Sequence, residues 1–161
     1  KIDSISIRSV TNALTYVNVD QDQRELFRFI DGAWLGQELV VNGDFAYDGD
    51  WVKQQGTTIS GGNLVLDTAT TFATLASQNL TLDSGSLFTL GLDINSYVAG
   101  TVNIRQGASG ANNIIAATAD GVYSVDFAGA SQSDVQVRSS GTSTQANVGK
   151  ISINRKIEIA P

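Results

Sequence analysis

The feature that most constrains this chain is the alternation of apolar and polar residues in short segments after residue 38. Two segments, 87–94 and 121–127, show it most clearly. The residues that this pattern places in a core are Phe88, Leu90, Leu92, Ile94, Tyr123, Val125 and Phe127. The residues that it places outside are Thr89, Gly91, Asp93, Val122, Ser124 and Asp126. A period of two is that of half-buried β-strands.

Turn dipeptides separate these segments. Asp48-Gly49, Gly61-Gly62 and Asp120-Gly121 each lie between apolar runs, and no long stretch carries a helical period. The predicted strands are 38–41, 51–55, 57–60, 63–67, 72–82, 87–97, 100–105, 113–118, 121–127, 134–138 and 147–159. Short strands at turn spacings of about 8–12 residues predict an all-β sandwich or barrel.

Composition excludes several classes of function. The 161 residues include no cysteine and no histidine, which rules out disulfides, thiolate metal sites and His-dependent triads. The net charge of −6 would repel nucleic-acid phosphates. No apolar run approaches the roughly 18 residues of a membrane-spanning helix, and nothing resembles a signal peptide. We therefore expect no nucleic-acid binding and no membrane insertion.

The chain divides near residue 37. Residues 5–7 and 16–19 suggest two short strands, and 25–35 is typical of a hairpin around the turn Asp31-Gly32. So short a segment rarely builds a stable core alone. We expect residues 1–37 to be an attachment or oligomerisation segment and 38–161 to be the sandwich domain. The start at Lys1 rather than Met suggests a processed or excised piece, or residues that precede the numbering.

The order of motifs over residues 38–161 resembles a known family. The segment Asn42-Gly-Asp-Phe45 precedes Trp51, and Gly61-Gly-Asn-Leu64, Gln78-Asn-Leu-Thr-Leu82 and the strand 121–127 follow. This succession resembles the carbohydrate-binding-module-like jelly roll of bacteriophage tail, fibre and capsid-decorating proteins. The hairpin from Phe27 to Trp34 is similar to a short element of phage fibre proteins. The resemblance implies an antiparallel jelly-roll β-sandwich.

The same resemblance implies a role. The chain would be a non-enzymatic virion structural protein whose jelly roll adsorbs to host surface glycans. Its partners would be other virion proteins and further copies of itself, as a homotrimer. The alternative is a monomeric carbohydrate-binding module of a secreted, extracellular bacterial polysaccharide-active enzyme. A linker rich in Pro, Ser or Thr would favour the module, and none is seen.

Aromatic residues near turns and strand ends are candidates for sugar binding. An aromatic face packs on a sugar ring while polar side chains bind its hydroxyl groups. The candidates are Tyr47, Trp51 and Tyr97, with Arg105 as a polar partner. For Trp51 a core position that closes the sandwich is the favoured alternative, whereas Tyr47 and Tyr97 stay open between the two roles.

An acidic turn raises the question of a metal. Asp44, Asp48 and Asp50 could supply oxygen ligands to a structural calcium, which some members of the resembled family hold. The closing strand, however, carries cations that would oppose one: Lys150, Arg155 and Lys156. We therefore expect a solvated acidic turn and no cofactor.

Paired carboxylates are the remaining route to catalysis. Glycoside hydrolysis needs two carboxyl groups about 5–10 Å apart across a cleft. Asp93 and Asp126, with the three acidic residues of the turn, show no sign of that arrangement in the sequence. We expect no catalytic residues and no enzyme activity.

Overall fold

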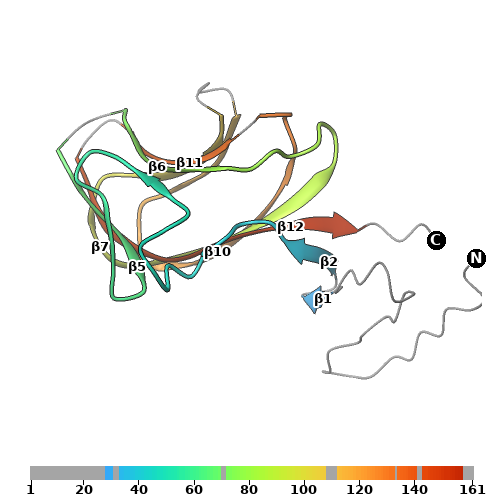
Figure 1. Ribbon diagram of the computed structural model, residues 1–161, viewed down its shortest axis with the longest axis horizontal. Helices are drawn as coiled ribbons and strands as arrows, with labels where there is room; N and C mark the ends of the chain where they lie inside the picture. Colours follow the sequence, from blue (N-terminus) through green and yellow to red (C-terminus); the bar gives the residue numbers. More distant parts are fainter. Residues whose placement is uncertain are drawn as a thin grey trace, which may run out of the picture.

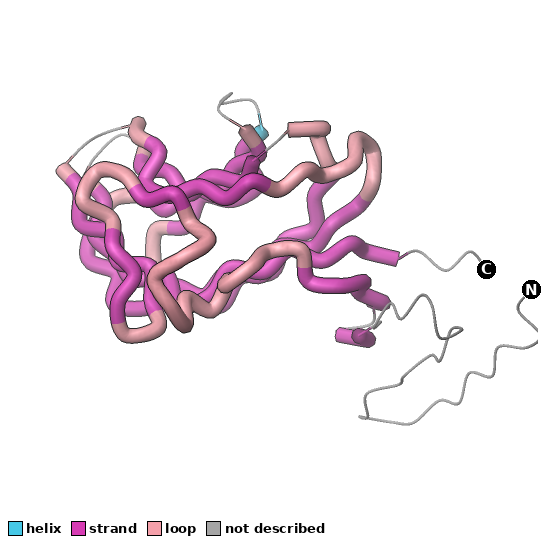
Figure 2. Tube along the Cα trace, viewed as in Figure 1, coloured by secondary structure: helices cyan, strands magenta, loops and turns pink. Residues whose placement is uncertain are grey.

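The computed structural model describes residues 28–30, 33–69, 72–107, 112–132, 134–140 and 143–157. The strands predicted at 5–7 and 16–19 lie outside these residues. The described part of the chain is built from β-strands and loops and contains no α-helix; the short cyan piece in Figure 2 is a 3₁₀ turn at residue 112. Accordingly, none of its segments is a helix long and apolar enough to cross a membrane. The prediction of an all-β protein is confirmed.

Twelve strands lie within the described residues. They are β1 (Arg28–Ile30), β2 (Ala33–Glu38), β3 (Val52–Lys53), β4 (Thr58–Ser60), β5 (Asn63–Thr68), β6 (Thr74–Asn79), β7 (Leu87–Ala99), β8 (Val102–Gln106), β9 (Asn113–Ala117), β10 (Gly121–Ala128), β11 (Asp134–Ser139) and β12 (Thr144–Ile157).

The strands form two antiparallel sheets that pack face to face (Figure 1). Sheet A has the order β5-β12-β7-β10, with β4 beside β5 and the hairpin β1–β2 beside the end of β12. Sheet B has the order β3-β6-β11-β8-β9. From β5 to β12 the chain changes sheet at every step except the hairpin β8–β9. This crossing pattern is that of a jelly roll, so the predicted topology is confirmed.

The core lies between the sheets and follows the alternation of β7. Phe88, Leu90, Leu92 and Ile94 are at most 2% exposed. From sheet B they are met by equally buried residues: Leu75, Val102, Ile104, Val135 and Val137. The prediction for this strand is confirmed because β7 is central, with β12 on one side and β10 on the other.

Strand β10 keeps the predicted alternation but buries less of it. Tyr123, Val125 and Phe127 face inward and are only half-buried. Among the described residues β10 pairs with β7 alone, so one of its flanks is open. Phe127 still stacks on Phe88, with ring centroids 5.7 Å apart. An edge strand has a neighbouring strand on one flank only, so its inward side chains are less covered. The alternation of apolar and polar residues does not show which strands lie at an edge.

Three predicted strands end earlier than expected. The segment 38–41 leaves sheet A after Glu38, because the Gln78 side chain hydrogen-bonds to both the N–H and the C=O of Val41 (2.9 and 2.8 Å). The segment 72–82 shortens to β6, since Phe72 adopts a left-handed φ of 54° that a strand does not tolerate. The segment 51–55 keeps only the two residues of β3, and the other predicted strands begin and end within three residues of those observed.

The N-terminal hairpin is present where it was predicted. Strand β1 pairs with β2 in the register Phe29↔Trp34 and Ile30↔Ala33, and the turn residues 31–32 lie outside the described part. Strand β2 in turn pairs with β12, so the hairpin continues sheet A. The expected boundary at residue 37 therefore falls inside a strand of the sandwich sheet.

Candidate functional site

The loop between β2 and β3, residues 39–51, is organised by one side chain. Asn42 Nδ2 donates to the carbonyl oxygens of Tyr47 (2.7 Å) and Gly49 (3.0 Å). Asn42, Phe45 and Asp50 all have left-handed φ angles, of 51°, 54° and 62°. Such backbone conformations persist only where surrounding contacts fix them. The loop is therefore held in one shape by its own hydrogen bonds.

Trp51 lies in the core. It is 4% exposed, its ring packs on Phe45 with centroids 5.6 Å apart, and its Nε1 donates to the Asn42 carbonyl oxygen (3.2 Å). Trp51 therefore has the alternative role that the sequence favoured, a core residue that closes the sandwich. A ring buried in this way has no free face for a sugar.

Tyr47 is the exposed aromatic of this loop, 56% exposed. Its hydroxyl donates to the Asp50 carboxylate, and this hydrogen bond raises the pKa of the tyrosine above its usual value. The Asp48 carboxylate pairs with Lys53. Two of the three acidic side chains of the turn are thus engaged by protein groups. No group of three or more acidic residues suited to a metal ion occurs in the described part of the chain.

The cations expected to oppose a metal lie elsewhere. Arg155 pairs with Asp83, and Lys156 pairs with Asp126. Both are residues of β12, which contacts the loop through the backbone hydrogen bond from Ile151 to Gly43 (2.8 Å). The third cation, Lys150, is the cross-strand neighbour of Asp93. The sequence predicts that all three oppose a metal, and the structure pairs Arg155 and Lys156 with carboxylates outside the acidic turn.

Tyr97 and Arg105 lie in separate surroundings. Tyr97 is half-buried at the end of β7, and its hydroxyl donates to the Gly100 carbonyl oxygen (2.8 Å). Arg105 is on β8 in sheet B, where its Nε donates to Asn113 Oδ1 (3.3 Å). With Tyr47 on the β2–β3 loop, the sequence-predicted binding residues contact different segments and do not form one site.

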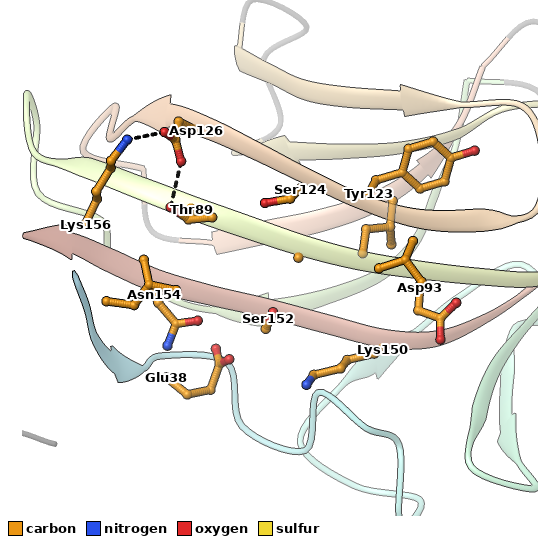
Figure 3. A pocket seen from close by; sticks show the side chains of 14 residues that line it. Glu38, Thr89, Asp93, Tyr123, Ser124, Asp126, Lys150, Ser152, Asn154 and Lys156 are labelled. Atoms are coloured by element: carbon orange, nitrogen blue, oxygen red, sulfur yellow. Dashed lines mark hydrogen bonds and ion pairs between the residues drawn. The ribbon is translucent and has the colours of Figure 1, made fainter. Parts of the chain in front are cut away.

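A groove of about 420 Å³ runs over the outer face of sheet A (Figure 3). Its floor is the row Ser124–Gly91–Ser152, which crosses β10, β7 and β12 in register. Gly91 has no side chain and the two serines are small, so the sheet is hollow at this row. We call this feature the sheet A groove. Small polar floors admit a ligand close to the backbone.

Charged side chains stand at both ends of the groove. At one end Asp126 accepts hydrogen bonds from Lys156 and from Thr89 Oγ1 (2.7 Å), as Figure 3 shows. The bond from Lys156, more than that from Thr89, lowers the pKa of Asp126 below its usual value. Toward the other end Asp93 and Lys150 are cross-strand neighbours. Donors and acceptors thus alternate along the groove.

Glu38 lies beside the groove where β2 ends. Its Oε1 accepts hydrogen bonds from the N–H groups of Ile153 (2.7 Å) and Val40 (2.9 Å). The residue as a whole is exposed, but the carboxyl group lies against the backbone, and this desolvation raises its pKa in spite of the two bonds. Glu38 therefore fastens the β2 end to β12. Asp126 is likewise held by neighbouring side chains, so both carboxylates have structural partners.

The groove residues were visible in the sequence, although not as a site. Gly91, Asp93, Val122, Ser124 and Asp126 form the outward half of the alternation in β7 and β10. For β12 the sequence predicts a strand and marks Lys150 and Lys156 as cations that oppose a metal, which does not place them in a groove. A search for aromatic residues missed the groove because its floor is made of small ones.

Comparison with known proteins adds no assignment. Neither the family models that were scanned nor the curated proteins that were searched contain a match to this chain.

Proposed function

We propose that the protein is a non-enzymatic virion structural component, a part of a phage tail, fibre or capsid decoration, whose jelly roll adsorbs to host surface glycans through the sheet A groove. The observation that carries the binding part is the groove itself, with its floor of one glycine and two serines. Polar groups of both kinds along such a groove suit a ligand with many hydroxyl groups.

The balance of charges supports a neutral glycan at this groove. Asp126 with Lys156 and Asp93 with Lys150 set opposite charges next to each other. With Glu38 the groove is lined by three carboxylates and two ammonium groups, a local charge close to zero, and hydroxyl groups can donate to the carboxylates and accept from the ammonium groups. Affinity for one site should be weak and gain strength from many copies on one particle.

Filling the groove should weaken adsorption. In Ser124→Ile a branched side chain, well suited to a strand, would occupy the floor beside Gly91. We expect the affinity of each site to fall by about tenfold, equal to about 1.4 kcal/mol, and cell or glycan-array adsorption of the multimeric protein to fall at least as much. Ser60→Ile is the matched control, since Ser60 is an exposed strand residue outside the groove. Equal loss in both variants, or hydrolysis of the bound glycan, would contradict the proposal.

Assembly discriminates between the virion protein and the secreted module. We propose a homotrimer whose residues 1–27 attach it to the particle, whereas a module would be a monomer. Because β1 and β2 belong to sheet A, a deletion should end before Arg28. Light scattering should give three times the chain mass for the full protein and a folded monomer for the deletion. A monomeric full-length protein would favour the secreted module.

A further inference from the structure

The outer face of sheet B holds a buried donor without a partner. Asn103 on β8 is 3% exposed and lies between Val102 and Ile104, both of which point into the core. Because side chains alternate along a strand, Asn103 must point to the outer face. Its Nδ2 has no hydrogen-bond partner. Buried polar groups are nearly always paired, so this one calls for an explanation.

A second such donor stands directly opposite. Arg138 on β11 is the register partner of Asn103, and its Nε is also buried and unpaired. Its other nitrogens are fixed: NH1 donates to Thr74 Oγ1 and Gln136 Oε1 (both 3.0 Å), and NH2 to the Phe72 carbonyl oxygen (2.8 Å). Opposed side chains have Cβ atoms about 4.5–5.5 Å apart, so the two side chains leave the sheet at neighbouring positions, and the Arg138 guanidinium is directed toward β6 by its bonds to Thr74 and Phe72.

Arg105 brings a free positive charge to the same face. It lies two residues along β8 from Asn103 and opposite Gln136. Its Nε donates to Asn113, and its terminal nitrogens have no partner among the described residues. On the outward faces of β8 and β11 the one carboxylate is Asp134, which accepts from Gln136 Nε2 (2.6 Å). In a chain of net charge −6, this face is locally positive.

We propose that the outer face of sheet B binds an acidic saccharide through its carboxylate. Arg105 would donate to the carboxylate from the surface, and Asn103 Nδ2 and Arg138 Nε, which neighbouring atoms cover in this structure, would donate to ligand oxygens once the ligand displaces that cover. These three groups are donors, and a carboxylate offers only acceptors. Phe72, 67% exposed and bound through its backbone to Arg138, offers an aromatic surface at the rim. The site is independent of the sheet A groove on the opposite face.

The first test varies the ligand. Binding of the full chain to polygalacturonate and to its fully methyl-esterified form would be compared by calorimetry, because the ester keeps the sugar and loses the charge. The acid should bind at least about tenfold more tightly. Equal binding of the two forms would overturn the proposal. Equal binding of dextran sulfate or polyglutamate would also overturn it, since any polyanion would then suffice.

The second test varies the protein. Arg105→Gln and Arg155→Gln remove one positive charge each, the first from this face and the second from β12 of sheet A, outside both proposed sites. We expect Arg105→Gln to weaken binding of the acid by about tenfold or more and Arg155→Gln to change it less than about threefold. Equal weakening of acid binding by the two substitutions would show that binding depends on net charge alone, and would overturn the assignment of the site to sheet B.

Asn103→Leu separates a ligand role from a structural one. An amide that lacks a partner can be replaced by an apolar group of similar shape with little change in stability. We expect an unchanged or higher Tm together with about tenfold weaker binding of polygalacturonate. A Tm several degrees lower, or full binding by the variant, would show that Asn103 is not part of a carboxylate site.

Discussion

Replacing Leu90 by Ala should lower the free energy of unfolding by about 2–5 kcal/mol. Leu90 is at the middle of β7, fully buried between the sheets, with Val125 and Ile153 as its register partners on the two neighbouring strands. Removing three heavy atoms there loses their transfer free energy and leaves a cavity that the central strand cannot close. Urea unfolding, followed by fluorescence of the buried Trp51, would give the difference.

Val122→Ala is the control for this substitution. Val122 is 83% exposed on the adjacent strand β10, and its loss should change the free energy of unfolding by about 0.5 kcal/mol or less. Similar effects of the two substitutions would mean that β7 is not the centre of a packed core, and the assignment of the sandwich interior would fail.

Replacing Gly43 by Ala should cost about 3 kcal/mol, at the upper end of what overpacking causes. A Cβ on Gly43 would lie well under 3.0 Å from the carbonyl oxygen of Ile151, and within 3.0 Å of a Val40 methyl group. The first of these is backbone of the central strand β12, which cannot move aside as a side-chain tip could. The hydrogen bond from the Ile151 N–H to the Gly43 carbonyl (2.8 Å) would also be disturbed.

Gly36→Ala makes the same chemical change without the clash. Its Cβ would lie 3.5 Å from the Arg155 carbonyl oxygen, an ordinary contact distance. The free energy of unfolding should stay within about 1 kcal/mol of the parent, helped by the reduced freedom of the unfolded chain. The comparison by urea unfolding tests the close approach at Gly43. If Gly43→Ala were as mild as Gly36→Ala, the β2–β3 loop would not lie against β12 as described.

The residues of the Asn42-Gly-Asp-Phe45 motif are required by contacts with segments far away in the chain. The sequence places it between an apolar segment and an acidic turn, and in the structure residues 41–44 form a turn themselves. Its glycine is required by β12, more than a hundred residues later in the chain, and the residue before the motif, Val41, is held by Gln78 of β6. Neither partner could be inferred from spacing, since both depend on how the sheets fold over each other.

The aromatic candidates illustrate the limit of searching by residue type. Tyr47, Trp51 and Tyr97 are close to turns in the sequence, but Trp51 belongs to the core and Tyr97 bonds back to its own strand end. Phe72, which the sequence placed inside a strand, is the aromatic that the fold exposes beside Arg138. Exposure is decided by where a strand stops, and that depends on backbone angles set by tertiary contacts.

The sequence by itself determined the strands, their inward faces and the absence of cysteine and histidine chemistry, because a period of two and composition are local properties. Only the tertiary structure decided which outward residues become neighbours. The jelly-roll crossings bring Ser124, Gly91 and Ser152 into one row on sheet A, and Asn103 and Arg138 into one pair on sheet B. Cross-strand register joins residues far apart in the chain, and no short-range pattern specifies it.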